Sequence, residues 1–455
     1  MIRRNPPPES FESIWMTMER LELILEEPDK VFFSGDAIRG QVLVYLSASI
    51  AVQAVVVKFI GEACVSVPEG VGADKPTKKR KNVTNKIAPI KNEAGMNETN
   101  PAPAPGWAKD KTPPASNASA APTPSTPVKL RSKSSTRSSL GPKPVFSSHE
   151  KYFFHKEYLY GHKYSSFREK LWPGNHSFPF QFTLPAQLPA SFQGRFGYVR
   201  YYCEALLLRW KEKDVRRVYF SVTNTADINT NTLAESGCEE QKTTNSCFFC
   251  CPRGTIVASA ELKRRGFAPG EIAPLLVEIH NMSNSTITTL KAVIFQVVEY
   301  SSSQGLRHHE DERRVLEVNR GEVKPGSSMS WGSAGVRLPP LPPTSFTPDS
   351  CKIISIQYRI DIQIYITGVQ EPLTLKLPII IGNIPLKRHF PALATAEDLG
   401  ELLAASFPKH TYARYPHLPG TTSQESVNPE QADCVYKLPH FKPRYLVYVP
   451  KTLVT

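Results

Sequence analysis

Hydrophobic and polar side chains alternate along much of the chain with a period of two residues. Aromatic and leucine side chains occupy every second position from Phe178 to Leu184, and isoleucine does so from Ile360 to Ile366. This alternation predicts β-strands that bury one face and expose the other to water. Further strands are expected at 21–25, 38–46, 55–59, 153–160, 199–208, 215–222, 255–263, 273–280, 290–300 and 373–381.

These strands are separated by Gly, Pro and Asn rather than by helical sequence. No helical run of ten or more residues lies between them, whereas a parallel α/β sheet needs helices as crossovers. The pattern therefore favours antiparallel β-sandwiches, and the predicted fold class is all-β.

Two segments recur later in the chain. The turn Gly35–Asp36 and its following strands resemble Gly270–Glu271 and the strands after it, 235 residues further on. The motif LPAQLPASF at 184–192 resembles LPPLPPTSF at 338–346, only 154 residues further on. The smaller second offset predicts two homologous β-sandwiches, the first of which carries an insertion of about 81 residues ahead of the LPAQLPASF motif.

The stretch 68–150 has the composition expected of that insertion. It contains only two aromatic residues and 13 of the 41 prolines of the 455-residue chain, so it is predicted to be disordered. It also holds fourteen basic and six acidic residues, which gives it +8 of the chain's formal charge of +13. The remaining chain is only mildly basic, and no specific nucleic-acid partner is expected.

The ordered motifs resemble the arrestin superfamily and, within it, the α-arrestins or arrestin domain-containing proteins. LELILEEPDKVFFSGDAIRGQVLVYL is similar to the family's opening strands, and FQGRFGYVRYYCEALLLRW to a late strand of the first domain. CFFCCPRGTIVASAELKRRGFAPGE is similar to the passage into the second domain, and GNIPL to the exit from it. The resemblance covers roughly 20–67, 150–225 and 250–386.

This resemblance implies two arrestin-like, immunoglobulin-like sandwiches that act as a non-catalytic adaptor in protein transport. The implied partners are cytoplasmic tails of membrane receptors or transporters, and endocytic or sorting adaptors. The expected location is cytoplasmic, peripheral at the plasma membrane or endosomes, with the nucleus left open. The predicted organisation is an N-terminal extension at 1–19, a first domain at 20–225 interrupted at 68–150, a hinge at 226–253, a second domain at 254–386 and a flexible tail at 387–455.

Two family features are missing from the sequence. No Pro-Pro-x-Tyr motif for WW domains is present, and the nearest tail element, Lys442-Pro443-Arg444-Tyr445, lacks one proline. Recruitment of a ubiquitin ligase is therefore left open. The first strand, from Leu21 to Glu26, has no adjacent lysines, so phosphate sensing of the visual and β-arrestin kind is not expected.

A compact basic run lies in the insertion. Its charged members suit a nuclear import signal or a patch for an anionic membrane surface, and a solvated charge run is an equal alternative. These residues are Lys75, Lys78, Lys79, Arg80 and Lys81.

Serines among arginines follow in RSKSSTRSS, as basophilic kinases prefer. Because each phosphate adds about −1.5 to −2 charge, we hypothesise an electrostatic switch of the insertion's field. The candidate phosphorylation sites are Ser132, Ser134, Ser135, Ser138 and Ser139.

A cysteine cluster lies in the predicted hinge at Cys247, Cys250 and Cys251. Zinc would need a second, well-spaced ligand pair that the sequence lacks, so no metal is expected. S-acylation beside Phe248 and Phe249 and reduced thiols at a hinge are the two remaining interpretations.

Two short patterns in the tail match sorting signals. Asp398, Leu402 and Leu403 fit an acidic dileucine signal, and Tyr415 with Leu418 fits a tyrosine signal for clathrin adaptors. Alternatively, 394–407 forms an amphipathic helix over the second sandwich.

The sequence contains no catalytic constellation, so neither an enzymatic activity nor a cofactor is expected. His308–Asp311 is predicted to be a polar hairpin tip rather than a metal site. Two alternatives to the adaptor stay open: a retromer-like coat subunit, and a signalling scaffold imported into the nucleus through the basic run.

Overall fold

A computed structural model of the chain describes residues 20–68, 144–162, 169–209, 213–248, 251–332, 335–347, 350–389, 410–414 and 441–448. These residues form twenty-four β-strands and two 3₁₀ helices, η1 (Ile228–Thr230) and η2 (Lys387–His389), which confirms the all-β fold class. Among them, no helix is long and apolar enough to span a membrane.

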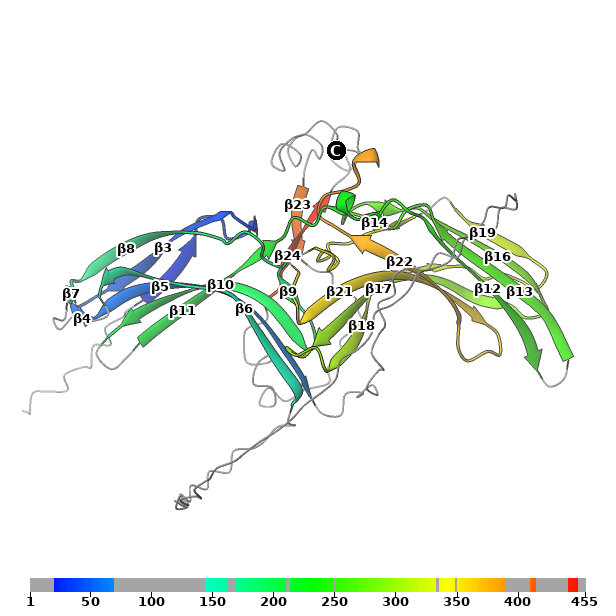
Figure 1. Cartoon of the computed structure of the whole chain (residues 1–455), viewed down its shortest axis with the longest axis horizontal. Coiled ribbons are helices and arrows are strands. Elements are labelled where there is room, and N and C mark those ends of the chain that lie inside the picture. Colours follow the sequence, from blue (N-terminus) through cyan, green and yellow to red (C-terminus); the bar gives the residue numbers. More distant parts are fainter. Residues whose placement is uncertain are drawn as a thin grey trace, which may run out of the picture. The chain divides into compact units, whose positions relative to one another are not determined.

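The first sandwich contains a three-stranded sheet and a six-stranded sheet (Figure 1). The smaller sheet has the order β1 (Arg20–Leu25), β3 (Ala37–Leu46), β8 (Gly174–Thr183). The larger sheet has the order β2 (Val31–Phe33), β11 (Lys213–Thr223), β10 (Gly197–Leu208), β5 (Ala54–Pro68), β6 (Pro144–Gly161). Its sixth strand, β9 (Phe192–Gln193), pairs with β10. Strands β4 (Ile50–Val52) and β7 (Glu169–Leu171) form a separate two-stranded sheet.

The second sandwich repeats this arrangement. Its first sheet has the order β12 (Cys238–Phe248), β13 (Cys251–Leu262), β16 (Leu275–Ser283), β19 (Ser328–Trp331). Its second sheet has the order β14 (Gly266–Phe267), β22 (Leu373–Ile381), β21 (Ile354–Ile366), β17 (Ile287–Ser301), β18 (His308–Arg320). Two small pairs complete the fold: β15 (Ile272–Ala273) with β20 (Val336–Arg337), and β23 (His410–Arg414) with β24 (Arg444–Tyr448).

The central strands bury the side chains that the alternation predicted. In β5, Val55, Val57 and Phe59 are fully buried in the core, and Ile360, Ile362 and Ile364 are fully buried in β21. Core burial of such β-branched and aromatic side chains supplies most of the favourable free energy of a sandwich.

Hydrogen bonds confirm the duplication in both copies. Gly35 and Gly270 both have positive φ, 89° and 95°, which glycine tolerates without strain. In the first copy, Leu184 N donates to the O atom of Asp36, the residue after Gly35, at 2.9 Å. In the second copy, Leu338 N donates to the O atom of Glu271, the residue after Gly270, at 2.8 Å. The turn and the Leu-Pro motif are therefore joined in the same way in each sandwich.

The two Leu-Pro motifs differ by one residue, which the sequence comparison did not detect. Leu184 corresponds to Leu338, but the next buried leucine is Leu188 in the first copy and Leu341 in the second. The extra residue in the first copy coincides with Gln187, whose φ is +77°. A positive φ at a non-glycine residue marks a locally strained turn, which accommodates the additional residue.

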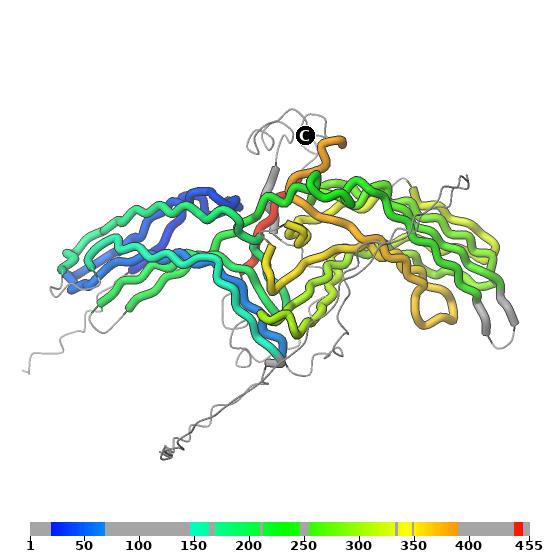
Figure 2. Tube along the Cα trace, in the orientation of Figure 1, coloured from blue at the N-terminus to red at the C-terminus, as the bar shows by residue number. Residues whose placement is uncertain are grey.

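The disordered insertion predicted at 68–150 extends too far at its C-terminal end. Strand β6 begins at Pro144, and the stretch 144–150 pairs with the end of β5 rather than being disordered. Phe146 lies opposite Val67 and is only 9% exposed. Figure 2 shows the blue end of β5 running beside the blue-green β6. The start of the strand was missed because it holds only two apolar positions, Val145 and Phe146, before the polar run SSHEK.

The predicted hinge at 226–253 was also too long. Strand β12 occupies 238–248 and pairs with β13 as part of the second sandwich. Both sandwiches belong to one compact unit. The connection is therefore limited to about 224–237, where Asp227 bridges to Ile384 and η1 begins.

Candidate functional site

The outer face of the six-stranded sheet of the first sandwich is built from successive cross-strand rows. Core residues of β10 alternate with residues that face outward, and the strand register aligns the outward ones with their neighbours. We call this surface the row face. Its central row is aromatic and apolar, and it runs across β6, β5, β10 and β11 as Phe154, Ile60, Tyr202 and Tyr219.

The next row is charged and consists of Lys156, Lys58, Glu204 and Arg217. Glu204 accepts from Lys58 Nζ at 2.9 Å and from Arg217 Nη2 at 2.7 Å. Burial opposes ionisation of Glu204, but these two hydrogen bonds outweigh it and hold its pKa below the ordinary value. Glu204 is therefore ionised at neutral pH and fixes both basic side chains.

Arg200 lies on the other side of the aromatic row, opposite Glu62. Gln193 Oε1 accepts from Arg200 Nε at 2.9 Å and from Nη2 at 2.6 Å, while Nη1 is buried without a hydrogen-bond partner among the described residues. The guanidinium stacks over the Tyr198 ring at 4.2 Å. Burial lowers its pKa, yet arginine stays charged, so the row face carries a cation to which no carboxylate of the described residues hydrogen-bonds directly.

The C-terminal segment 441–448 reaches the edge of this face. Phe441 stacks on Tyr219 with ring centroids 5.3 Å apart. Arg444 N donates to Ser221 Oγ at 2.9 Å, and its guanidinium pairs with Asp29 at 2.6 Å. The segment thus continues the row face with residues far away in the sequence.

The same segment contacts both sandwiches. On the first sandwich, Tyr445 is 4% exposed, and its hydroxyl donates to Ser191 O at 3.0 Å. The contacts with the second sandwich come from Tyr448. Tyr448 N donates to Pro269 O at 2.9 Å, and its hydroxyl bonds to Asn383 O. The predicted flexible tail therefore needs correction for 441–448, because three buried hydrophobic side chains hold this stretch on both sandwiches: Tyr445, Leu446 and Tyr448.

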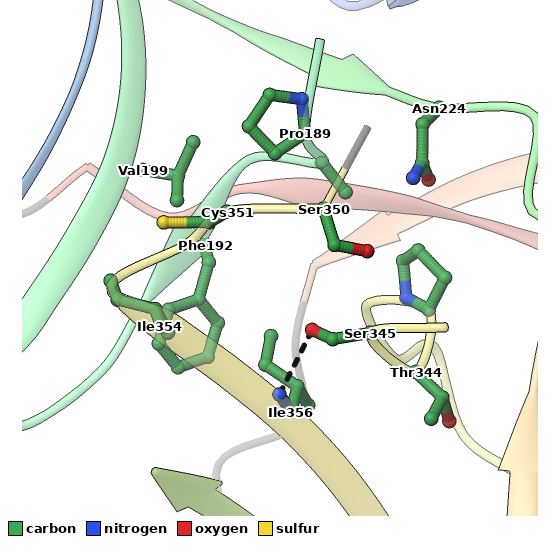
Figure 3. A pocket seen from close by; sticks show the side chains of 12 residues that line it. Pro189, Phe192, Val199, Asn224, Thr344, Ser345, Ser350, Cys351, Ile354 and Ile356 are labelled. Carbon is green, nitrogen blue, oxygen red and sulfur yellow. Dashed lines mark hydrogen bonds between the residues drawn. The ribbon is translucent and has the colours of Figure 1, made fainter. Parts of the chain in front are cut away.

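The two copies of the Leu-Pro motif meet where the sandwiches join. They line a small cavity, around which Figure 3 shows Pro189 and Phe192 of the first copy with Thr344 and Ser345 of the second. Nearby, Asn383 Nδ2 donates to Thr223 Oγ1 at 2.8 Å and to Asn224 O at 2.7 Å. These bonds give the GNIPL motif a structural role in joining the second sandwich to the first.

Two of the predicted cysteines lie away from the connection. Cys247 pairs with Pro252, and Phe248 pairs with Cys251, at the end of the β12–β13 hairpin. Strand β13 pairs with β16 only from Gly254 onward. The hairpin end that contains Cys247 and Cys251 therefore projects past the end of β16. The hinge interpretation is corrected accordingly, and Cys250 lies outside the described residues.

The other predicted sites fall where the structure gives no description: the basic run at 75–81, the serines at 132–139, and the sorting patterns at 398–403 and 415–418. The described residues include no group of His, Cys, Asp or Glu that could hold a metal ion. His308–Asp311 starts strand β18 rather than forming a hairpin tip, with His309 against Phe196.

Neither the row face nor the docked C-terminal segment was predicted as a site. A signal was present in β10, where the outward positions of GYVRYYCEALLL include the aromatic Tyr198 and Tyr202 and the apolar Leu206 beside Arg200 and Glu204, whereas the outward face of a strand exposed on one side is mostly polar. The bridging role of 441–448 left no local signal, because it depends on contacts with residues 65 to 415 positions away.

Comparison with known proteins agrees with this architecture. The model of the arrestin N-terminal domain matches residues 125–229, and that of the arrestin C-terminal domain matches 252–386. Strands β1 to β5 lie outside the matched range 125–229, but they form sheets with strands β6 to β11 and therefore belong to the same N-terminal sandwich. The two sandwiches are thus those of the arrestin class of proteins.

Curated relatives define the group within this class. The chain is 31% identical to arrestin domain-containing protein 17 of Caenorhabditis elegans over 250 residues, 52% of this chain and 57% of that protein. It is 34% identical to human arrestin domain-containing protein 4 over 221 residues, 47% of this chain and 50% of that protein. The chain therefore spans about half the length of these relatives, and it belongs to the arrestin domain-containing proteins, or α-arrestins.

Proposed function

We propose that this protein is a non-catalytic adaptor that links membrane cargo, the cytoplasmic tails of receptors or transporters, to endocytic, sorting or ubiquitination machinery. Its working location would be the cytoplasmic side of the plasma membrane or endosomes. The ligase arm of this proposal requires a contact other than Pro-Pro-x-Tyr, since that motif is missing.

The docking of 441–448 across both sandwiches is the observation that carries this proposal. Five hydrogen bonds or ion pairs and three buried side chains hold an extended stretch of chain against residues of both domains. A scaffold that accommodates one extended peptide this way has the surface chemistry needed for others.

Proximity labelling in cells tests the adaptor function. The full chain should label integral membrane proteins together with endosomal or ligase components. A chain that ends before 387 should keep its membrane cargo, if the sandwiches bind it, and lose the machinery recruited by the tail. Labelling of nuclear proteins alone would favour the imported scaffold. Stable, stoichiometric association with coat proteins would favour the coat subunit.

A further inference from the structure

The row face of the first sandwich is the strongest unassigned surface of the molecule. We propose that it binds an extended acidic peptide with a central aromatic residue, in the pattern acid-x-aromatic-x-acid. This inference rests on the proposed adaptor function, since such a peptide would be the recognition element of a cargo or partner tail.

The aromatic row offers a receptor for a ring. Phe154 is 55% exposed, an unusual exposure for a phenylalanine in the middle of an 18-residue strand. At the other end of the row, Tyr219 already holds the ring of Phe441 in a stacked geometry. The chain's own segment thus demonstrates that this row accepts an aromatic side chain, while its Phe154 end stays uncovered.

The charges on both sides of that row favour acidic residues. The two charged rows contain five basic side chains, Lys58, Lys151, Lys156, Arg200 and Arg217, against only Glu62 and Glu204. Glu204 is already shared between two of the basic groups. Lys151 and Lys156 are exposed. The ammonium group of Lys151 lies 5.7 Å from the centre of the Phe154 ring, and that of Lys156 lies 4.3 Å from the centre of the Tyr158 ring.

Arg200 adds a buried positive charge to the first of these rows. Its guanidinium lies 5.8 Å from the Tyr219 ring of the aromatic row, its Nη1 has no hydrogen-bond partner among the described residues, and no described carboxylate hydrogen-bonds to its other nitrogens. A buried cation without a carboxylate partner attracts an anion at the surface above it, because the interior screens its charge less than water does. A ligand carboxylate on the Lys151 side of the aromatic row is therefore favoured electrostatically.

The spacing of the rows determines the sequence pattern. Neighbouring rows are two residues apart along β5 and β10, a separation of roughly 6.6 Å. In β6, a bulge places Lys151 three residues from Phe154, and it still lies opposite Glu62 in the adjacent row. An extended peptide that lies along the strands has the same repeat, so its residues i, i+2 and i+4 meet three successive rows. The order of the rows is basic, aromatic, basic, which gives acid-x-aromatic-x-acid.

The corresponding face of the second sandwich lacks this chemistry. There, Arg359 binds both carboxylate oxygens of Glu312 at 2.8 Å and Asp361 through Nε at 2.8 Å. Lys291 is paired with Glu317 at 2.8 Å. Acidic partners already neutralise these cations, so selectivity for an acidic peptide is expected on the first sandwich.

Fluorescence anisotropy with the full-length chain tests the proposal directly. The probe is a labelled Gly-Ser-flanked peptide containing Asp-Gly-Phe-Gly-Asp. The variant K151E/K156E should weaken its binding by about tenfold, in a salt-dependent manner. Phe154→Ala should also weaken it. The exposed double variant K263E/K324E makes the same charge change on the second sandwich and should leave binding unchanged.

Peptide variants separate this mode from simple charge attraction. The permuted peptide Asp-Asp-Phe-Gly-Gly has the same composition without the spacing and should bind several-fold more weakly. Equal binding of the two peptides, or equal binding by K151E/K156E and the parent chain, would overturn the proposal. Binding only to phosphatidylserine vesicles, and not to the peptide, would identify the face as a membrane contact instead. If the peptide fails but proximity labelling still finds membrane cargo, the adaptor function stands and cargo uses another surface.

Discussion

Tyr201 donates a hydrogen bond from its hydroxyl to the backbone carbonyl of Pro189 at 2.7 Å. In the second sandwich, Tyr358 makes the equivalent bond to Pro342 at 2.8 Å. Both bonds are buried and tie the central strand of the larger sheet to the Leu-Pro motif. Since a buried carbonyl needs a partner, each tyrosine satisfies one that the proline-rich turn cannot pair within a strand.

Removing either hydroxyl should destabilise the protein. Tyr201→Phe leaves a buried carbonyl unpaired and should lower the free energy of unfolding by about 1 kcal/mol. Tyr358→Phe should cost more, because its hydroxyl also accepts from the buried Gln296 Nε2 at 2.8 Å. Guanidinium denaturation of the full chain measures this. Tyr365→Phe, which loses a half-buried bond to Gln363, is the control and should cost less. No loss of stability in Tyr201→Phe, or a larger loss there than in Tyr358→Phe, would contradict these roles.

Glu204 should make stability depend on pH. Its folded pKa lies below its ordinary value of 4.5, so its contribution is present above about pH 4.5 and is lost as the pH falls through the folded pKa. Glu204→Gln should therefore destabilise the protein by about 1–3 kcal/mol at pH 7, because Lys58 and Arg217 lose an ionised acceptor. The difference should shrink in acid. The exposed Glu278→Gln should show no such trend.

The C-terminal segment should detach when its tyrosine anchors are removed. Tyr445→Ala deletes a buried ring and its bond to Ser191, which should cost about 3 kcal/mol of local stability. Hydrogen exchange measures the result as lost protection across β24, with the sandwich cores unaffected. Val447→Ala, at a half-buried position of the same strand, is the control. Unchanged protection in Tyr445→Ala would show that the anchor is dispensable.

Asn383 should couple the two sandwiches. Asn383→Ala removes two buried hydrogen bonds, to Thr223 and to Asn224, and should destabilise the chain by about 2 kcal/mol. Calorimetry should show the unfolding transition broadening or separating into two, because the domains lose part of their connection. The exposed Asn319→Ala should leave the transition intact, and an equal effect of both variants would argue against the coupling role.

The sequence predicted the strands that bury one regular face. Ile360 to Ile366 and Phe178 to Leu184 lie in β21 and β8, and the repeated turn and Leu-Pro motif correctly indicated two related sandwiches. These features are local, because the periodicity of a half-buried strand is written in its own residues. The arrestin resemblance rested on the same ordered segments.

The parts that the sequence did not predict depend on distant contacts. Strands β12 and β18 lie at the edges of their sheets and are polar on much of both faces, so TTNS and HHEDERR carry no alternation. The docking of Tyr445 and Tyr448 depends on Ser191, Pro269 and Asn383, which no periodicity in the tail can indicate. The row face likewise exists only once β6, β5, β10 and β11 are in register.

The meeting of the two Leu-Pro motifs at the cavity has a consequence for how the halves can diverge. Homologous turns that face each other resemble the isologous contact of a symmetric dimer, in which every substitution appears on both sides at once. Fusion into one chain removes that constraint, so one half can change while the other does not. The additional Gln187, the unneutralised cations of the first half and the fully paired Arg359 of the second are the kind of asymmetry that a true dimer could never acquire.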